Sequence, residues 1–240
     1  MVNSKLLKKN KILIIAAHPD DEILGCGGTI LKLKKNNKIK VIFLTDGISA
    51  RKSNKKLKNK RKKECLNLFK YLKLDKPFFL DFPDNQLDKI PLLKIVKKIE
   101  KILFNFKPNI VFTHFENCLN VDHQIAYKST ITACRPLKKN PVEKILSFEV
   151  LSSTDWAAFS NKSFQPNYFI NITDQIKEKL HSISFYKSEL RNYPHSRSLK
   201  SIETLARSRG TSSGFKFAEA FFIVRELEKW TNDIKYKQKT

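Results

Sequence analysis

One short stretch of the sequence gathers side chains that can carry out metal and acid–base chemistry. His18 and Pro19 are followed by three acids, Asp20, Asp21 and Glu22, directly after an apolar run. Three adjacent carboxylates repel one another, and a place at the end of a buried strand adds a desolvation cost. A divalent cation would offset that repulsion. His18 and Asp21 are close enough in a strand-to-helix turn to bind one ion, and this ligand set favours zinc.

A third ligand has to come from elsewhere in the chain, because catalytic zinc sites use three protein ligands and leave a position for water. His123 is the best candidate, since it follows the fourth predicted strand at the start of a helix. The metal lowers the pKa of its water, and Asp20 is free to take the proton. Each of these residues also has a plain structural interpretation when it is considered alone. Asp21 could cap a helix, and His114 and His123 could be buried structural histidines.

The elements that must position these residues follow from the apolar pattern. Strands are predicted at 11–17, 39–45, 77–80, 109–113 and 144–150, and helices at 21–35, 54–72, 87–104 and 121–134. This alternation indicates an α/β fold with a mostly parallel sheet and helices on both faces. Further along, a strand at 167–172, helices at 173–190 and 198–209 and a strand or helix at 217–225 are predicted. We expect one domain over 1–240, with a charged and partly frayed tail at 226–240.

Polar clusters follow the ends of the first four predicted strands. They span 18–21, 45–47, 81–85 and 113–114. In open α/β sheets ligands bind beyond the carboxyl ends of the strands. The four clusters are therefore expected to share one site.

The same residues resemble a known family signature. The stretch HPDDE at 18–22, followed by LGCGGT at 24–29, resembles the signature of the PIG-L/LmbE-like zinc-dependent N-deacetylases. Thr45-Asp46-Gly47 with Arg51 is similar to the second loop of that family, and Asn120-Val121-Asp122-His123 to its third. Segments 186–189, 194–198 and 218–221 resemble C-terminal segments of some sugar-modifying members.

The resemblance implies a Rossmann-like fold and hydrolysis of the N-acetyl group of an amino sugar or sugar conjugate. It makes His18, Asp21 and His123 the ligands of one catalytic Zn²⁺, and Asp20 the general base. Asp122 would orient a neighbouring imidazole, as residues behind metal ligands commonly do. Zinc and a hydrogen-bond donor would stabilise the oxyanion that forms when water attacks the acetamide.

The third motif departs from the pattern of the family, which usually reads His-x-Asp-His. Asn120 stands at the first position of this motif. An asparagine can donate a hydrogen bond to an oxyanion, but it cannot give up a proton at neutral pH. Either Asp20, once protonated, serves both proton-transfer steps, or His114 replaces the missing imidazole. We favour Asp20 in both roles and keep His114 as a candidate helper.

The charge of the chain bears on its substrate. Lys and Arg number 47 against 23 Asp and Glu, a formal net charge of +24. This balance is typical of polyanion binding, but a lysine-rich codon bias explains much of it. The segment 51–63 has basic residues and no acid. It is either a solvated helix face or a lip for a phosphate-bearing substrate, such as a nucleotide- or lipid-linked sugar, with Arg51 nearest the pocket.

Four further side chains are candidates for substrate binding. Asp84 and Asn85 could hydrogen-bond sugar hydroxyls, although Asp-Asn is also a common turn. His195 and Arg197 are further candidates for binding phosphate, in a loop that Pro194 would also shape for structural reasons.

The remaining features concern compartment, partners and alternatives. Four scattered cysteines without a C-x-x-C pair fit a reducing cytoplasm, and no segment is long enough to span a membrane; a homo-oligomer stays open. A nucleotide-binding Rossmann-like domain is disfavoured, because residues 25–28 do not match G-x-G-x-x-G. A nucleic-acid-binding protein is the other alternative, but the sequence carries no helix-turn-helix, zinc-finger or RRM pattern, so no specific nucleic-acid partner is expected.

Overall fold

The sheet at the centre of the molecule has seven strands. The computed structural model describes residues 9–48, 55–137, 142–157 and 163–228. The strand order is β3-β2-β1-β4-β5-β7-β6. The strands are β1 (Lys11–Ala16), β2 (Lys38–Thr45), β3 (Phe78–Phe82), β4 (Ile110–His114), β5 (Lys144–Phe148), β6 (Tyr168–Asn171) and β7 (Ala218–Glu226). The first five run parallel and β7 is antiparallel to both β5 and β6. The predicted α/β class with a mostly parallel sheet is confirmed, and the segment at 217–225 is a strand.

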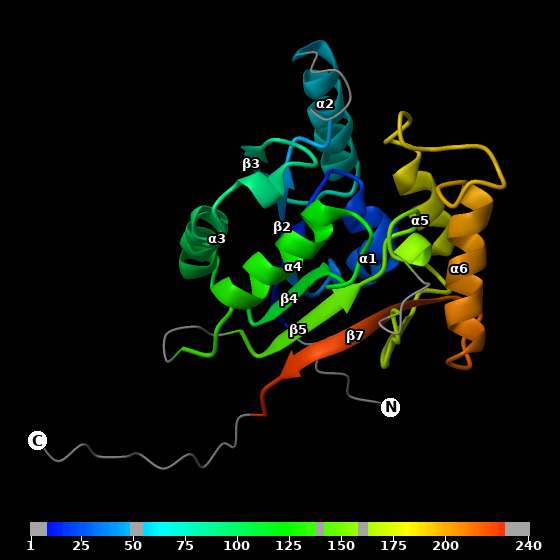
Figure 1. Ribbon diagram of the computed structural model, residues 1–240. Helices are drawn as coiled ribbons and strands as arrows, with labels where there is room; N and C mark the ends of the chain where they lie inside the picture. The colour runs from blue at the N-terminus through cyan, green and yellow to red at the C-terminus, as the bar shows by residue number, and fades with distance from the viewer. Residues whose placement is uncertain (1–8, 49–54, 138–141, 158–162, 229–240) are drawn as a thin grey trace, which may run out of the picture.

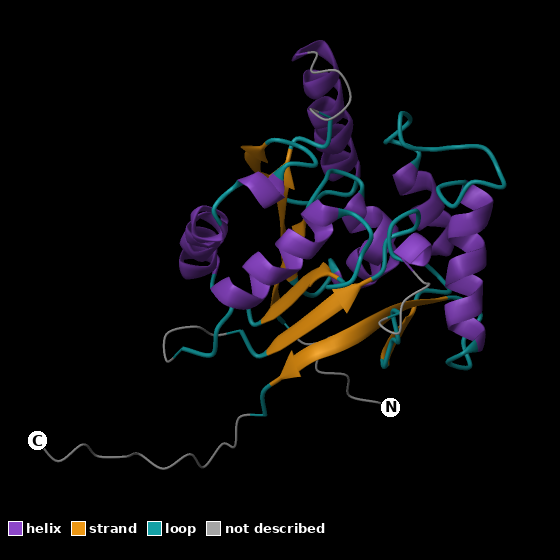
Figure 2. Cartoon of the chain, viewed as in Figure 1, coloured by secondary structure: helices purple, strands orange, loops and turns teal. Residues whose placement is uncertain are grey.

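Helices cover both faces of this sheet (Figures 1 and 2). They are α1 (Asp21–Leu33), α2 (Lys55–Tyr71), α3 (Leu92–Phe106), α4 (Val121–Ala133), α5 (Ile176–Ile183) and α6 (Leu199–Thr211), with 3₁₀ turns η2 (Leu87–Lys89) and η3 (Asp155–Ala157). Along β1, Ile12 and Ile14 enter the core that α1, α2, α5 and α6 close, while Leu13 and Ile15 enter the core under α3 and α4. This alternation is what a central strand buried on both faces requires. None of the helices in the described ranges is long and apolar enough to cross a bilayer.

Two predicted helices differ from the observed ones. The segment expected as one helix over 87–104 is divided into η2 and α3, with Pro91 as the N-cap of α3. Pro disfavours a helical conformation in the residue before it, so the helix can begin only after it. The helix expected over 173–190 is shorter, since α5 ends at Ile183 and turns follow it.

The first helix is kinked where its glycines lie. Cys26 has non-helical backbone angles (φ −144°) inside α1. A Cβ atom at Gly25 would lie 2.3 Å from the ring of Phe148, and one at Gly28 would lie 2.8 Å from Ile172. These two glycines are therefore positions where neighbouring side chains pack directly against the backbone. Their surroundings are filled by protein side chains, which argues against a dinucleotide loop.

Candidate active site

Three of the four predicted polar clusters at the strand ends meet in one place. His18 follows β1, Asp84 follows β3, His114 ends β4, and Asp122 and His123 lie in the first turn of α4. The Nε2 atom of His18 lies 3.0 Å from Asp84 and 3.2 Å from Asp122. The expectation that the carboxyl ends of parallel strands share one site holds for these residues.

Three donor atoms form a small triangle on the other side of the His18 ring. His18 Nδ1 and Asp21 Oδ2 are 3.1 Å apart, and His123 Nε2 lies 3.3 Å from the first and 3.4 Å from the second. Donors bound at about 2.0–2.1 Å around a tetrahedral ion lie roughly 3.3–3.4 Å from one another. Within the described residues, Asp21 Oδ1 and His123 Nδ1 are buried without a hydrogen-bond partner. Two imidazoles and one carboxylate at this spacing therefore fit a divalent metal ion.

The electrostatics of His123 and Asp21 suit the same role, whereas burial acts to lower the pKa of His18 but the Asp21, Asp122 and Asp84 carboxylates outweigh it and raise this pKa well above its usual value. Burial, reinforced by the neighbouring His114, lowers the pKa of His123 to about 3. Burial acts to raise the pKa of Asp21, but the imidazoles of His123, His114 and His18 outweigh it and hold this pKa well below its usual range. A neutral imidazole and an ionised carboxylate are the forms that bind metals.

The His18 ring is oriented from behind by Asp122. Besides its contact with His18, Asp122 accepts hydrogen bonds from the backbone N–H groups of Asn85 (2.7 Å) and Leu87 (3.0 Å). These bonds fix the carboxylate, so it can hold the imidazole with Nδ1 toward the triangle. This contact matches the orienting role that the resemblance implies for Asp122.

Asp20 lies beside the triangle and is almost completely buried. Burial raises its pKa to about 7, although the Arg197 guanidinium acts to lower it. Its backbone has φ 125°, and its N–H donates to Glu22 Oε2 at 2.9 Å. Burial also raises the pKa of Glu22 to about 8, while the hydroxyl of Tyr186, which donates to Glu22 Oε1 at 2.6 Å, opposes this shift. Asp20, which directly precedes Asp21 of the triangle, is therefore a carboxyl group whose pKa lies near neutral pH.

The comparison with known proteins decides the family. Residues 13–134 match the family model PIG-L, described as GlcNAc-PI de-N-acetylase. The chain belongs to the PIG-L family. Residues 186–198 and the strand β7 lie outside the matched segment.

Curated relatives and solved structures agree with this PIG-L assignment. The chain is 28% identical to "Uncharacterized deacetylase YaiS" of Escherichia coli over 75% of this chain and 92% of that protein. It is 27% identical to the diacetylchitobiose deacetylase of Thermococcus kodakarensis over 93% of this chain and 86% of that protein.

Two solved structures share the fold of this PIG-L protein. The N,N'-diacetylchitobiose deacetylase of Pyrococcus horikoshii, complexed with its inhibitor, has a TM-score of 0.75 and 23% identity over 94% of this chain and 87% of that one. The zinc-inhibited form of teicoplanin deacetylase Orf2 has a TM-score of 0.69 and 14% identity over 91% of this chain and 100% of that one. At these identities the likeness shows the fold alone.

His114 and Asn120, the two residues discussed for the missing histidine of the third motif, have distinct surroundings. The Nε2 atom of His114 accepts a hydrogen bond from the backbone N–H of Ala17 at 2.9 Å, and its ring stacks on His123 with centroids 3.9 Å apart. Asn120 caps α4, since its side-chain oxygen accepts from the N–H of Asp122, and its amide donates to Asn85 Oδ1 at 3.1 Å. His114 thus packs against His123 of the donor triangle, whereas the Asn120 amide lies at the exposed side.

The residues predicted for substrate binding fall at different places. Asp84 is buried against His18, and Asn85 contacts Asp122 through its backbone. Arg197 donates to Asp20 Oδ2 at 2.9 Å. His195 contacts Arg197 rather than Asp20: its Nδ1 accepts the backbone N–H of Arg197 at 3.0 Å, and its ring lies 5.5 Å from that of Trp156. Arg51 lies outside the described residues, as does most of the predicted tail, from 229 to 240.

Sequence reasoning missed two charged residues of the site. Arg61 belongs to the basic run at 51–63, yet its side chain is only 2% exposed and donates to the carbonyl of Pro19. Glu189 ion-pairs with both Arg61 and Arg197. The available signal for Arg61 was its place three residues before Glu64; for Glu189 it was the resemblance of segment 186–189, to which no role was attached.

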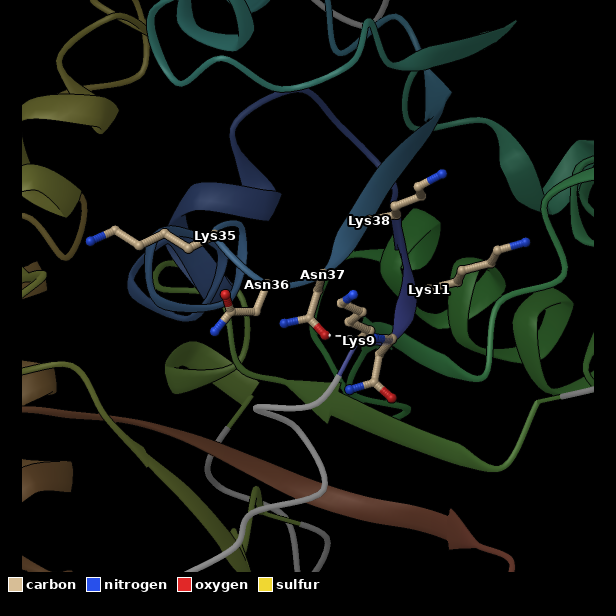
Figure 3. Close-up of a pocket in the computed structure, with 7 residues that line it drawn as sticks. Lys9, Lys11, Lys35, Asn36, Asn37 and Lys38 are labelled. Carbon is tan, nitrogen blue, oxygen red and sulfur yellow. Dashed lines mark hydrogen bonds between the residues drawn. The ribbon is translucent and has the colours of Figure 1, made fainter.

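Four lysines gather at the opposite end of the strands. A cavity of about 840 Å³ at the start of β1 and β2 is lined by Lys9, Asn10, Lys11, Lys35, Asn36, Asn37 and Lys38 (Figure 3). In Figure 3 the side chain of Lys35 points to one side and those of Lys11 and Lys38 point to the other, so they do not converge on one centre. This cavity is separate from the candidate active site, which follows the carboxyl ends of the same strands.

Proposed function

We propose that this protein is a zinc-dependent hydrolase that removes the N-acetyl group from an amino sugar or a sugar conjugate. The observation that carries the proposal is the triangle of donor atoms from His18, Asp21 and His123 with the buried Asp20 carboxyl beside it. Membership of the PIG-L family and the deacetylase relatives support an amide as the bond that is cleaved.

The donor set supports zinc as the cofactor. His18, Asp21 and His123 would hold the ion, which would supply Lewis-acid polarisation of the acetamide and acidification of water. Three protein ligands from two histidines and one carboxylate are typical of catalytic zinc sites. The zinc-inhibited form of the Orf2 deacetylase, which shares this fold, supports zinc as an ion that such proteins accept.

The residues of the chain move the protons and support the charge. Asp20 accepts a proton from the attacking water as the C–O bond forms, and gives it to the nitrogen as the C–N bond breaks. The products are acetate and a free amine. Asn120, whose amide lies at the exposed side of the site, donates a hydrogen bond to the developing oxyanion. We assign both proton transfers to Asp20, because His114 already uses Nε2 as an acceptor for Ala17.

We further propose that the substrate is a phosphate-bearing sugar linked to a nucleotide or a lipid. We place the reaction in the cytoplasm. The high positive charge supports an anionic substrate. Asp84 and Asn85 lie at the site and supply acceptors for sugar hydroxyls.

A substrate screen tests the proposal. Zinc-loaded protein is incubated with N-acetylated sugars that are free, nucleotide-linked or lipid-linked, and amine and acetate release are measured. Protein stripped with a chelator and then reloaded is the control. We expect equal molar release of both products from one class, lost on stripping and restored on reloading. Absence of amine release from every class by fully zinc-loaded protein would contradict the proposal.

A further inference from the structure

The segment that follows α5 brings two charged side chains to Asp20. Residues 184–198 form turns, and Glu189 and Arg197 point from them into the site. Glu189 is 5% exposed and the side chain of Arg197 is 16% exposed. Both lie outside the segment that matches the family model.

Arg197 is bound on several sides within the protein. Its Nη1 donates to Asp20 Oδ2 at 2.9 Å and to Glu189 Oε2 at 2.8 Å. Its Nε donates to the hydroxyl of Ser152 at 2.7 Å. A guanidinium is a rigid planar fork, so contacts through Nε and Nη1 fix the orientation of the whole group. Held in this way by Ser152 and Glu189, the guanidinium aligns the Asp20 carboxylate.

Glu189 links Arg197 to a second arginine. It ion-pairs with Arg61, whose Nη1 donates to the carbonyl of Pro19 at 3.0 Å and lies 3.7 Å from Asp20 Oδ2. Two arginines and two carboxylates thus alternate around the loop at 19–20. Because each buried charge faces an opposite one, the cluster can persist without an uncompensated charge.

The backbone of Asp20 explains why such a support is needed. A φ of 125° is rarely adopted by residues other than glycine, and strained conformations persist only where the surroundings over-determine them. Glu22 holds this residue by its N–H group, and Arg197 holds it by its carboxylate.

We propose that Arg197 is a positioning residue, aligned by Glu189 and Ser152, that fixes the Asp20 carboxylate for proton transfer. The inference rests on the proposed hydrolase function, and it replaces binding of a substrate phosphate as the role of Arg197. The guanidinium bonds given above are made inside the protein, so the loss of this group acts on the chemical step rather than on substrate affinity.

The test compares Arg197→Gln and Arg197→Lys with Arg209→Gln, on the zinc-loaded enzyme. Arg209 forms a matched, partly buried pair with Glu149 through two bonds of 2.8 and 2.7 Å, on α6. Loss of a residue that orients an active group commonly costs about 10- to 100-fold. We expect Arg197→Gln to lower kcat by that factor with KM within about twofold, Arg197→Lys to recover only part of it, and Arg209→Gln to keep both constants. A raised KM with unchanged kcat would overturn the inference, as would an equal fall of kcat in Arg209→Gln.

A second variant and a second readout keep the inference testable. If Arg197→Gln does not fold, Glu189→Gln removes the alignment of Arg197 and is expected to lower kcat in the same manner. A crystal structure of either variant needs no substrate, and we expect the Asp20 carboxylate to leave its wild-type position. An unmoved Asp20 would overturn the inference. Failure of the proposed function is a different result, namely no hydrolysis by the wild-type protein.

Discussion

Lys179 Nζ lies 2.7 Å from Glu219 Oε1 in the interior of the protein. This ion pair binds the backbone of α1 on both sides of the kink at Cys26. The carboxylate of Glu219 accepts hydrogen bonds from the backbone N–H groups of Gly28 (2.8 Å) and Thr29 (2.7 Å). Lys179 Nζ donates a hydrogen bond to the carbonyl of Leu24 at 3.0 Å. Side chains from α5 and β7 thus replace hydrogen bonds that the kinked helix cannot make itself, and they fix the helix that begins with Asp21, the proposed metal ligand.

Glu219→Gln is expected to destabilise the fold strongly. The substitution leaves the Lys179 ammonium buried without its opposite charge, and breaking a buried pair in this way costs about 3–5 kcal/mol. The free energy of unfolding is measured by urea denaturation. Glu226→Gln on the same strand is the control, because its pair with Lys144 is partly exposed and is worth about 1 kcal/mol or less. Equal losses in the two variants would contradict the role given to Lys179 and Glu219.

The meeting of His18, Asp84 and His123 could be predicted from sequence, because parallel strands bring their carboxyl ends to one edge. The division at Pro91 was not predicted, although the restriction that proline places on the residue before it is a sequence signal for it. The burial of Arg61 was not predicted: its spacing to Glu64 indicates a pair on one helix face, but it does not say that this face turns inward. The approach of Glu189 and Arg197 to Asp20 depends on turns, whose path is set by long-range ion pairs rather than by periodicity.

Asn120→Asp separates two roles of one residue. The carboxylate can still accept the N–H of Asp122 and cap α4, so we expect a melting temperature near that of the wild type. It offers no N–H to an oxyanion, and removing one such donor typically lowers kcat about 100- to 1,000-fold. Steady-state kinetics and thermal melting on the same preparation check both expectations. An unchanged kcat would remove Asn120 from the proposed mechanism.

Lys38→Glu is expected to stabilise the protein. Lys11 and Lys38 are paired neighbours on the parallel strands β1 and β2, and like charges directly opposite are destabilising. Reversing one of them should raise the free energy of unfolding by about 0.2–1 kcal/mol at low salt. The gain should shrink in high salt, where exposed charges are screened. A loss of stability at low salt would show that repulsion between Lys11 and Lys38 is not significant.

The central claim is that Asp20 transfers protons beside a zinc ion held by His18, Asp21 and His123. The most direct measurement is acetate release per bound zinc by Asp20→Asn, with zinc content determined on the same sample and His123→Ala as the variant that loses the metal. Removing a general acid–base group typically costs about 10²- to 10⁴-fold in rate. We predict that Asp20→Asn binds zinc as the wild type does and loses activity by that factor. Wild-type turnover by zinc-loaded Asp20→Asn would contradict the account.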